Sequence, residues 1–301
     1  MMCVVMTDYL LRIMQELEFD DESADSLYKD LLKIYSSPDS KSEFERAISL
    51  YQADICTSHT ELLEMADRAA DIAGVHRYSA ELLLYLCLSK HLKEIYIQRG
   101  IDLAIWHNSM LDLKWKLLEC KAVKGVVGSF VARWFAGFFK MTRFALGRLQ
   151  FELVDLKCDY EKGSKSIKQG SKVINVHIPR TLTPLDKESC DASYNAAKSF
   201  FANDLEGVNV AFVCHSWLLF PDVVAMCSEN SNIYRFAKQF DIVDVRYDND
   251  GEHPDAWRLF DTDYNGNIDE LPGDSSLRRA YKEFIRNGGR TGNGFGIFFA
   301  E

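Results

Sequence analysis

The feature that most constrains the fold is a change of hydrophobic period near Leu146. Upstream of it, apolar residues recur every three to four positions, and no proline occurs between Pro38 and Pro179; both features predict helices. Downstream, polar and apolar residues alternate from Arg148 to Asp155, as in a strand with two different faces. The 301 residues are enough for two ordinary domains. We therefore predict a two-part α+β protein.

We expect an all-helical N-terminal domain over residues 1–125, a connecting helix over 126–145 and a mixed α/β domain over 146–301. The connecting helix rests on the apolar run from Val126 to Phe139, which is shorter than the ~20 residues that a membrane span needs. A buried helix is the favoured interpretation, and a helix lying in a membrane interface is the alternative. The N-terminus has no basic region before a long apolar stretch, so we expect no signal peptide.

The α/β domain is predicted to run strand, strand, helix, strand, helical segment, strand, strand, helix, strand. The expected strands cover residues 148–155, 172–178, 208–217, 241–247, 256–260 and 294–299. Helices are expected near 186–202, 221–227, 231–239 and 275–287. The second strand, the first helix and the third strand form a βαβ unit, whose strands must be parallel.

Composition excludes some classes of partner. The net charge is −10, which argues against nucleic acid and against adsorption to an anionic membrane, since both need a concentrated positive face. The eight cysteines form no Cys-x-x-Cys motif. Reduced thiols in a cytoplasmic protein are the simplest interpretation, and no metal site is predicted.

Three candidate catalytic residues emerge from side-chain parity. Successive strand residues point to opposite faces, so Glu152, His177 and His215 can share one side of the sheet. The carboxyl ends of parallel strands are where open α/β sheets bind ligands. A histidine, or a glutamate with a raised pKa, can take a proton from an amine. The structural alternatives are hydrogen-bonding histidines at strand ends and a solvated Glu152–Arg148 pair.

Four neighbours of these residues are predicted to line a substrate pocket. Arg148 and Gln150 share the strand face of Glu152, and Ser216 and Trp217 follow His215. Trp217 could equally belong to the core.

Several motifs are set aside. Cys214 and His215 are adjacent on a strand and point to opposite faces, so they make a poor nucleophile–base dyad. Residues 261–269 match the start of a calcium-binding EF-hand loop, but the twelfth position is Pro272 instead of a bidentate glutamate. The glycine-rich run over 288–296 precedes a strand and lacks the Lys-Ser/Thr ending of a phosphate loop. We expect a polar turn at the first and a helix stop with a turn at the second.

Five segments of the second half resemble the GNAT-like acyltransferase C-terminal domain found in bacterial proteins. They are Leu146–Glu152, Val176–Pro179, His215–Leu219, Ser231–Phe236 and Leu271–Ala280. The helical half looks like the N-terminal domain that accompanies it, so the resemblance spans nearly the whole chain.

The resemblance implies acyl transfer from acyl-CoA or acetyl-CoA to a small-molecule amine or hydroxyl. In such folds the thioester lies where two parallel strands separate, and the pyrophosphate lies on the following loop. Here that loop is Arg180–Leu185, and the resemblance assigns Ile178, Arg180, Thr181 and Thr183 to cofactor binding. The acetyltransferase fingerprint Gln/Arg-x-x-Gly-x-Gly/Ala is absent from it. A non-enzymatic ligand-binding module on the same scaffold therefore remains the alternative, and a calcium-binding protein is a third.

Overall fold

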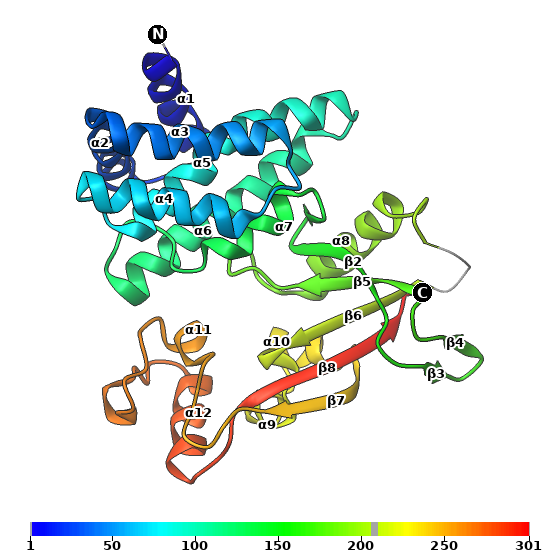
Figure 1. The fold of residues 1–301 in the computed structure, drawn as a ribbon. Coiled ribbons are helices and arrows are strands. Elements are labelled where there is room, and N and C mark those ends of the chain that lie inside the picture. The colour runs from blue at the N-terminus through cyan, green and yellow to red at the C-terminus, as the bar shows by residue number, and fades with distance from the viewer. Residues whose placement is uncertain (1, 206–209, 301) are drawn as a thin grey trace. The chain divides into compact units, whose positions relative to one another are not determined.

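The computed structural model describes residues 2–205 and 210–300, which form two compact units, Met1–Phe144 and Ala145–Glu301 (Figure 1). The first unit is helical and the second is built on a sheet, as the change of period predicts. Among the described residues, no helix is long and apolar enough to cross a membrane.

The helical unit contains six long helices and, over residues 2–142, no described strand. The helices are α1 Met2–Glu16, α2 Asp21–Ser36, α3 Pro38–Ala53, α4 His59–Ala73, α5 Arg77–Gln98 and α6 Leu103–Lys124. Their ends follow local chemistry. Asp20 caps α2 by accepting a hydrogen bond from the Ser23 N–H at 2.9 Å, and Gly74 ends α4 in the left-handed conformation (φ 63°).

Helix α5 is buried over most of its circumference and forms the centre of this unit. Tyr85 on α5 packs against Phe139, with ring centroids 4.7 Å apart. Tyr51 on α3 donates a hydrogen bond to the Phe139 carbonyl at 2.8 Å, and His59 on α4 is stacked on Tyr85. An aromatic cluster thus joins three helices to the segment that follows α6.

The predicted connecting helix over 126–145 is wrong. Gly125 adopts φ 66° and ends α6. Gly128 then lies so close to α5 that a Cβ would be 2.4 Å from the Tyr78 carbonyl carbon, and Ser129 N–H donates to Tyr78 O at 3.0 Å. This contact with another helix, which the apolar period does not encode, bends the chain out of a helix. The remainder forms the 3-10 turn η1 Ala132–Phe135, the one-turn helix α7 Ala136–Phe139 and the strand β1 Arg143–Leu146.

The second unit contains a six-stranded mixed sheet in the order β1-β2-β5-β6-β8-β7 and a two-stranded hairpin, β3-β4. The strands after β1 are β2 Leu149–Asp155, β3 Tyr160–Lys162, β4 Lys165–Ile167, β5 Lys172–His177, β6 Ala211–Ser216, β7 Asp241–Tyr247 and β8 Gly292–Phe299. The helical segments are α8 Lys187–Phe200, η2 Trp217–Leu219, α9 Pro221–Met226, α10 Asn232–Ala237, α11 Ala256–Phe260, η3 Ile268–Glu270 and α12 Ser276–Arg286. The β5-α8-β6 unit has the predicted parallel strands.

The predicted strand order differs from the structure in two places. Residues 256–260 form helix α11 instead of a strand, with Ala256 and Phe260, four residues apart, both buried; so short an apolar run cannot be assigned by periodicity. The β3-β4 hairpin is not among the predicted elements; each of its strands is only three residues long. Val208 and Asn209, at the start of the expected third strand, lie outside the described residues.

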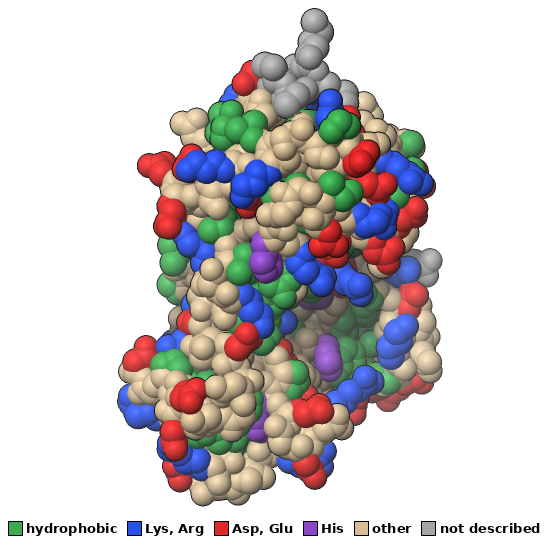
Figure 2. All heavy atoms as spheres, turned by 60° about the vertical axis from the view of Figure 1, so that its left-hand side comes forward, with side chains coloured by type: hydrophobic (Ala, Val, Ile, Leu, Met, Phe, Trp, Pro, Cys, Tyr) green, Lys and Arg blue, Asp and Glu red, His purple; other side chains and the backbone are tan. Residues whose placement is uncertain are grey.

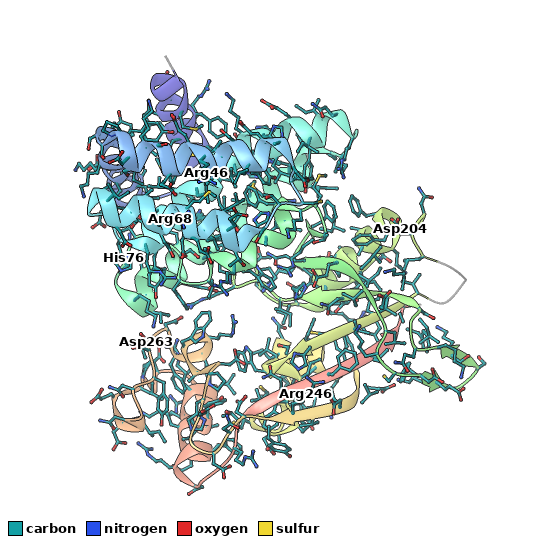
Figure 3. All side chains as sticks on the ribbon, viewed as in Figure 1. Arg46, Arg68, His76, Asp204, Arg246 and Asp263 are labelled. Atoms are coloured by element: carbon teal, nitrogen blue, oxygen red, sulfur yellow. The ribbon has the colours of Figure 1, made fainter. Side chains whose placement is uncertain are left out.

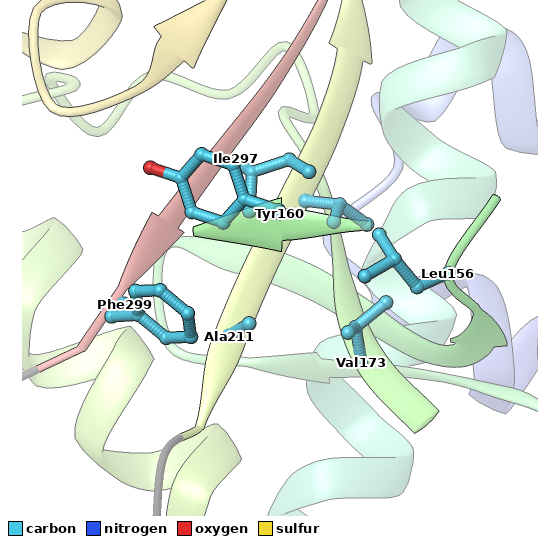
Figure 4. Packing of buried hydrophobic residues seen from close by; sticks show 7 residues of the cluster. Leu156, Tyr160, Val173, Ala211, Ile297 and Phe299 are labelled. Carbon is cyan, nitrogen blue, oxygen red and sulfur yellow. The ribbon is translucent and has the colours of Figure 1, made fainter. Parts of the chain in front are cut away.

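The two faces of the sheet are covered differently. On one face, the β3-β4 hairpin covers an apolar cluster at the amino ends of β5 and β6, which includes Tyr160, Val173 and Ala211 (Figure 4). On the other face, Tyr194 of α8 packs against Phe212, with centroids 4.9 Å apart. The side chains that fill both units are drawn in Figure 3.

Charged side chains of both signs are interspersed on the face drawn in Figure 2.

Candidate functional site

The sheet opens between β5 and β6 at their carboxyl ends. These parallel strands pair at Ile174↔Phe212 and Asn175↔Val213 only. Beyond that point β5 still pairs with β2 as far as His177, and β6 still pairs with β8 as far as Ser216. The two strands therefore part from each other while each keeps its outer neighbour (Figure 1). Their inner backbone edges become available to hydrogen-bond a ligand.

A glutamate and a histidine meet beside this opening. His177 Nε2 lies 2.7 Å from Glu152 Oε1, and Asn175 Nδ2 donates to the same oxygen at 3.1 Å. The pleat explains the contact: Glu152 lies opposite Asn175, and His177 lies two residues further on the same face. Both side chains are partly exposed, His177 to 19% and Glu152 to 18%. A carboxylate that accepts from Nε2–H fixes the imidazole with Nδ1 as its basic atom.

His215 lies on the same sheet face, across the opening. The pairing Asn175↔Val213 places Val213 and His215 on the face of Asn175 and His177. His215 is exposed, and its side chain makes no hydrogen bond within the described part of the chain. The structure thus brings Glu152 and His177 into contact and leaves His215 facing them without a direct bond.

Cys214 has no part in this site. It points to the opposite face from His215 and is buried, and burial raises the pKa of its thiol to about 12.

The four residues predicted to line a substrate pocket occupy different settings. Gln150 is buried opposite His177. Arg148 precedes β2 and donates from Nε to the Thr183 carbonyl at 2.8 Å and from Nη1 to the Pro179 carbonyl at 3.0 Å. Ser216 Oγ caps η2 by accepting from the Leu218 N–H at 3.2 Å, and Trp217 packs against the apolar cluster around α11 and α12.

The predicted phosphate loop connects β5 to α8. Ile178 and Thr181 are half-buried and Thr183 is exposed. Arg180 is half-exposed and is ion-paired with Asp261, its Nη2 lying 2.9 Å from Oδ2. Local sequence pattern cannot predict this ion pair, because Asp261 lies 81 residues further along the chain. Asp261 also accepts from Arg278 Nη2 at 2.6 Å.

The calcium-like segment is a polar turn held by side-chain bonds. Glu270 accepts from Asn265 at 2.7 Å and from Asn267 at 2.8 Å, and Asp269 is ion-paired with Arg286. No group of three or more metal-ligating carboxylate, histidine or cysteine side chains occurs among residues 2–205 and 210–300.

The glycine-rich run serves packing. Gly288 ends α12 in the left-handed region (φ 77°). A Cβ on Gly294 would lie 2.3 Å from Leu219 O, and one on Gly296 would lie 2.7 Å from Phe240 Cβ. Only glycine lets η2 and the end of α10 approach β8 this closely.

Comparison with known structures supports the fold. The chain covers 87% of an acyltransferase crystallised with decanoyl-CoA and teicoplanin, with 96% of its own residues aligned, a TM-score of 0.71 and 21% identity. The same coverage holds for an acyltransferase with decanoyl-CoA (TM-score 0.73, 20% identity) and one with CoA and 10C-teicoplanin (TM-score 0.72, 20% identity). The curated proteins compared with the chain contain no match.

Two family models divide the sequence between them. The N-acyltransferase N-terminal domain matches residues 8–141, and the GNAT-like C-terminal domain matches residues 144–298. Both match where the resemblance placed them, so the predicted fold and the predicted acyltransferase class are confirmed. The chain belongs to the GNAT-like acyltransferase family, with an N-acyltransferase N-terminal domain preceding the GNAT-like domain.

Proposed function

We propose that the protein transfers an acyl group from acyl-CoA to an amine or hydroxyl of a small-molecule acceptor by direct attack. The observation that carries this proposal is the Glu152–His177 pair, bonded at 2.7 Å, beside the opening between β5 and β6. The pair provides a proton acceptor, His177, next to an opening in which an extended ligand can bind. The neighbours crystallised with CoA thioesters support the choice of co-substrate.

The thioester lies in the opening, because its pantetheine arm carries amides that can pair with the unpaired backbone of β5 and β6. The phosphates then extend over the loop after β5, where Ile178, Arg180, Thr181 and Thr183 provide backbone and side-chain donors. This assignment keeps the reacting carbonyl near His177 and the charged end of CoA at the protein surface.

The chemical step follows from the pair's geometry. Glu152 accepts from Nε2–H and orients the ring, so Nδ1 of His177 takes the proton as the acceptor attacks the thioester carbon. Backbone N–H groups at the opening stabilise the tetrahedral oxyanion. The C–S bond then breaks, and the proton passes to the departing CoA thiolate. His215, on the same face across the opening, is the alternative base.

The teicoplanin-bound neighbours support a small-molecule acceptor for this chain. We place the reaction in the cytoplasm, where CoA thioesters are made. The cysteines that the structure describes are all free, as expected for a reducing compartment.

A ligand-binding module without catalysis is favoured by one observation, the absence of glycine from residues 179–185. A melt separates binding from chemistry. At a hundredfold excess over Kd, decanoyl-CoA should stabilise the protein by about 2.7 kcal/mol. Incubation with decanoyl-CoA and a panel of amines and alcohols, followed by mass spectrometry, detects the product.

Glu152→Gln and His177→Gln should retain the melt shift and lose the product, whereas His107→Gln, a control on α6, should retain both.

A melt shift without any acylated product over the whole panel would favour the binding module. No shift at millimolar decanoyl-CoA would refute the proposed acyl transfer and leave the binding module, for a different ligand, as the better interpretation.

A further inference from the structure

Arg148 binds the backbone of the loop that follows β5, residues 179–185. Its guanidinium contacts three backbone carbonyls there: Nη1 donates to Pro179 O at 3.0 Å, and Nε donates to Thr183 O at 2.8 Å and to Pro184 O at 3.2 Å. Burial lowers the pKa of Arg148, although an arginine remains charged at any physiological pH. The side chain is therefore committed to the loop backbone, which the predicted pocket role did not anticipate.

The backbone of Arg148 is also held by hydrogen bonds. The backbone N–H of Arg148 donates to Ser193 Oγ at 2.7 Å, and Ser193 Oγ donates to Ser189 O at 2.9 Å on α8. Gly147 allows the approach, because a Cβ there would lie 2.7 Å from Ser193 Oγ. Arg148 thus connects β2, α8 and the loop as one rigid group.

Two of the three contacts determine which way a loop N–H points; the third, to Thr183 O, holds the peptide of Pro184, which has no N–H. The described chain contains no cis peptide bond, and in a trans peptide the C=O and the N–H point in opposite directions. The carbonyls of Pro179 and Pro184 point at Arg148, so the N–H groups of Arg180 and Leu185 point away from it. Neither N–H has an acceptor within the described chain, and the same is true of the three N–H groups between them, those of Thr181, Leu182 and Thr183.

The start of α8 is closed to an anion. Asp186 accepts from the Ser189 N–H at 2.8 Å, and that bond lowers the pKa of its carboxyl. A carboxylate already occupies the helix end and repels a phosphate there. The donors left for a phosphate are the outward N–H groups of the loop.

We propose that Arg148 is a positioning residue for the CoA pyrophosphate: by holding the carbonyls of Pro179 and Pro184, it turns the N–H groups of Arg180 and Leu185 outward and replaces the missing glycines. In the usual fingerprint, glycines serve this purpose because they let the backbone adopt left-handed conformations and approach the phosphate closely. Here a guanidinium fixes the same polarity with ordinary residues. The inference rests on the proposed use of acyl-CoA and identifies how the loop accepts its charged end.

Two variants test this with probes that separate the parts of CoA. Arg148→Met, which has no donors, should lower the affinity for CoA and for inorganic pyrophosphate at least about tenfold and leave the affinity for pantetheine unchanged. Arg148→Lys keeps the charge but cannot hold three carbonyls, so it should show an intermediate loss. Lys172→Met removes an exposed charge at the other end of β5 and should leave all three affinities unchanged. Calorimetry measures the affinities, and CoA should protect residues 180–185 from hydrogen exchange in the wild type and in Lys172→Met but not in Arg148→Met.

Equal losses for CoA and pantetheine, or none in Arg148→Lys, would overturn the positioning role, and the lysine variant decides the matter if the methionine variant does not fold. Wild-type binding of pyrophosphate without binding of CoA would refute the proposed function and leave the loop inference standing. Wild-type binding of neither would refute both.

Discussion

Two histidines show how differently the helical unit and the sheet unit use polar groups. His59 of the helical unit has its Nδ1 2.9 Å from the Tyr85 hydroxyl and is only 4% exposed, with its ring stacked on Tyr85. His177 of the sheet unit lies 2.7 Å from the Glu152 carboxylate at the exposed end of a strand. One imidazole is a core side chain with a neutral partner, and the other is held by a charge where a substrate can reach it.

The glutamates repeat the contrast. Glu81 on α5 is buried, and its burial together with the Asp67 charge raises its pKa to about 7, in spite of the ion pair with Arg77. Glu152 accepts two hydrogen bonds at the opening of the sheet. Residue type alone therefore does not identify a site. Partial exposure, an oppositely charged partner and an open strand end together make Glu152 and His177 the candidates.

The largest expected effect separates the two histidines by activity. His177→Ala should lower turnover roughly 10²–10⁴-fold, the usual share of a general base, and shift the melting temperature by only about 1–2 °C. His59→Ala should do the reverse, destabilising the protein by about 2–4 kcal/mol through the cavity and the lost hydrogen bond. Product assays and urea unfolding measure the two quantities. Equal losses of turnover and stability in both variants would remove the contrast.

The next effect is the pH dependence that His59 gives the helical unit. Burial lowers the pKa of His59 to about 4, so between pH 4 and its ordinary value near 6.5 the unfolded chain binds a proton that the folded protein does not. Stability should therefore fall as pH drops through this window, by up to about 3 kcal/mol. His59→Phe should flatten that part of the profile in urea unfolding followed by circular dichroism. An unchanged slope would contradict burial as the cause.

Glu81 should act in the opposite direction. Because its pKa is raised from 4.5 to about 7, the folded protein keeps a proton that the unfolded chain loses between these values. Stability should fall as pH rises from about 4.5 to 7, by about 1–3 kcal/mol. Glu81→Gln should remove this slope and stabilise the protein most at pH 7 and above. If the variant is less stable at pH 8 than the wild type, the Arg77 ion pair outweighs the burial.

The smallest effect concerns the affinity for CoA and the ion pair between Arg180 and Asp261. Asp261→Asn removes the charge that holds Arg180 and suits the left-handed backbone of that position (φ 58°). If Arg180 contacts a CoA phosphate, the variant should bind CoA about 3–10-fold more tightly. Calorimetry beside Asp263→Asn controls for the loss of one negative charge. A weaker complex would show that the Asp261 link organises the site.

Periodicity predicted what depends on local pattern. The helices of the first unit follow the apolar period, and the pleat alone placed Glu152 and His177 on one face, because a strand's parity is fixed once its register is. Contacts between segments that are distant in the sequence could not be predicted from local pattern. The Gly128–Tyr78 approach prevents a helix at residues 126–131, and the three carbonyls bound by Arg148 lie 31–36 residues further on. The five-residue α11 is too short for its period to be read.

The glycines of β8 determine how closely neighbouring segments pack against the strand beside the candidate site. On one face of this strand, Gly292, Gly294 and Gly296 replace side chains with bare backbone, against which Phe220, Leu219 and Phe240 rest directly. A layer of packed side chains can repack, and its thickness then varies with each substitution. At Gly294 the contact is with the Leu219 backbone carbonyl, and a contact between two backbones cannot be relaxed by a change of rotamer. Since Gly294 is also the register partner of Ser216, the end of β6 that carries His215 is positioned by a contact that the repacking of side chains does not change.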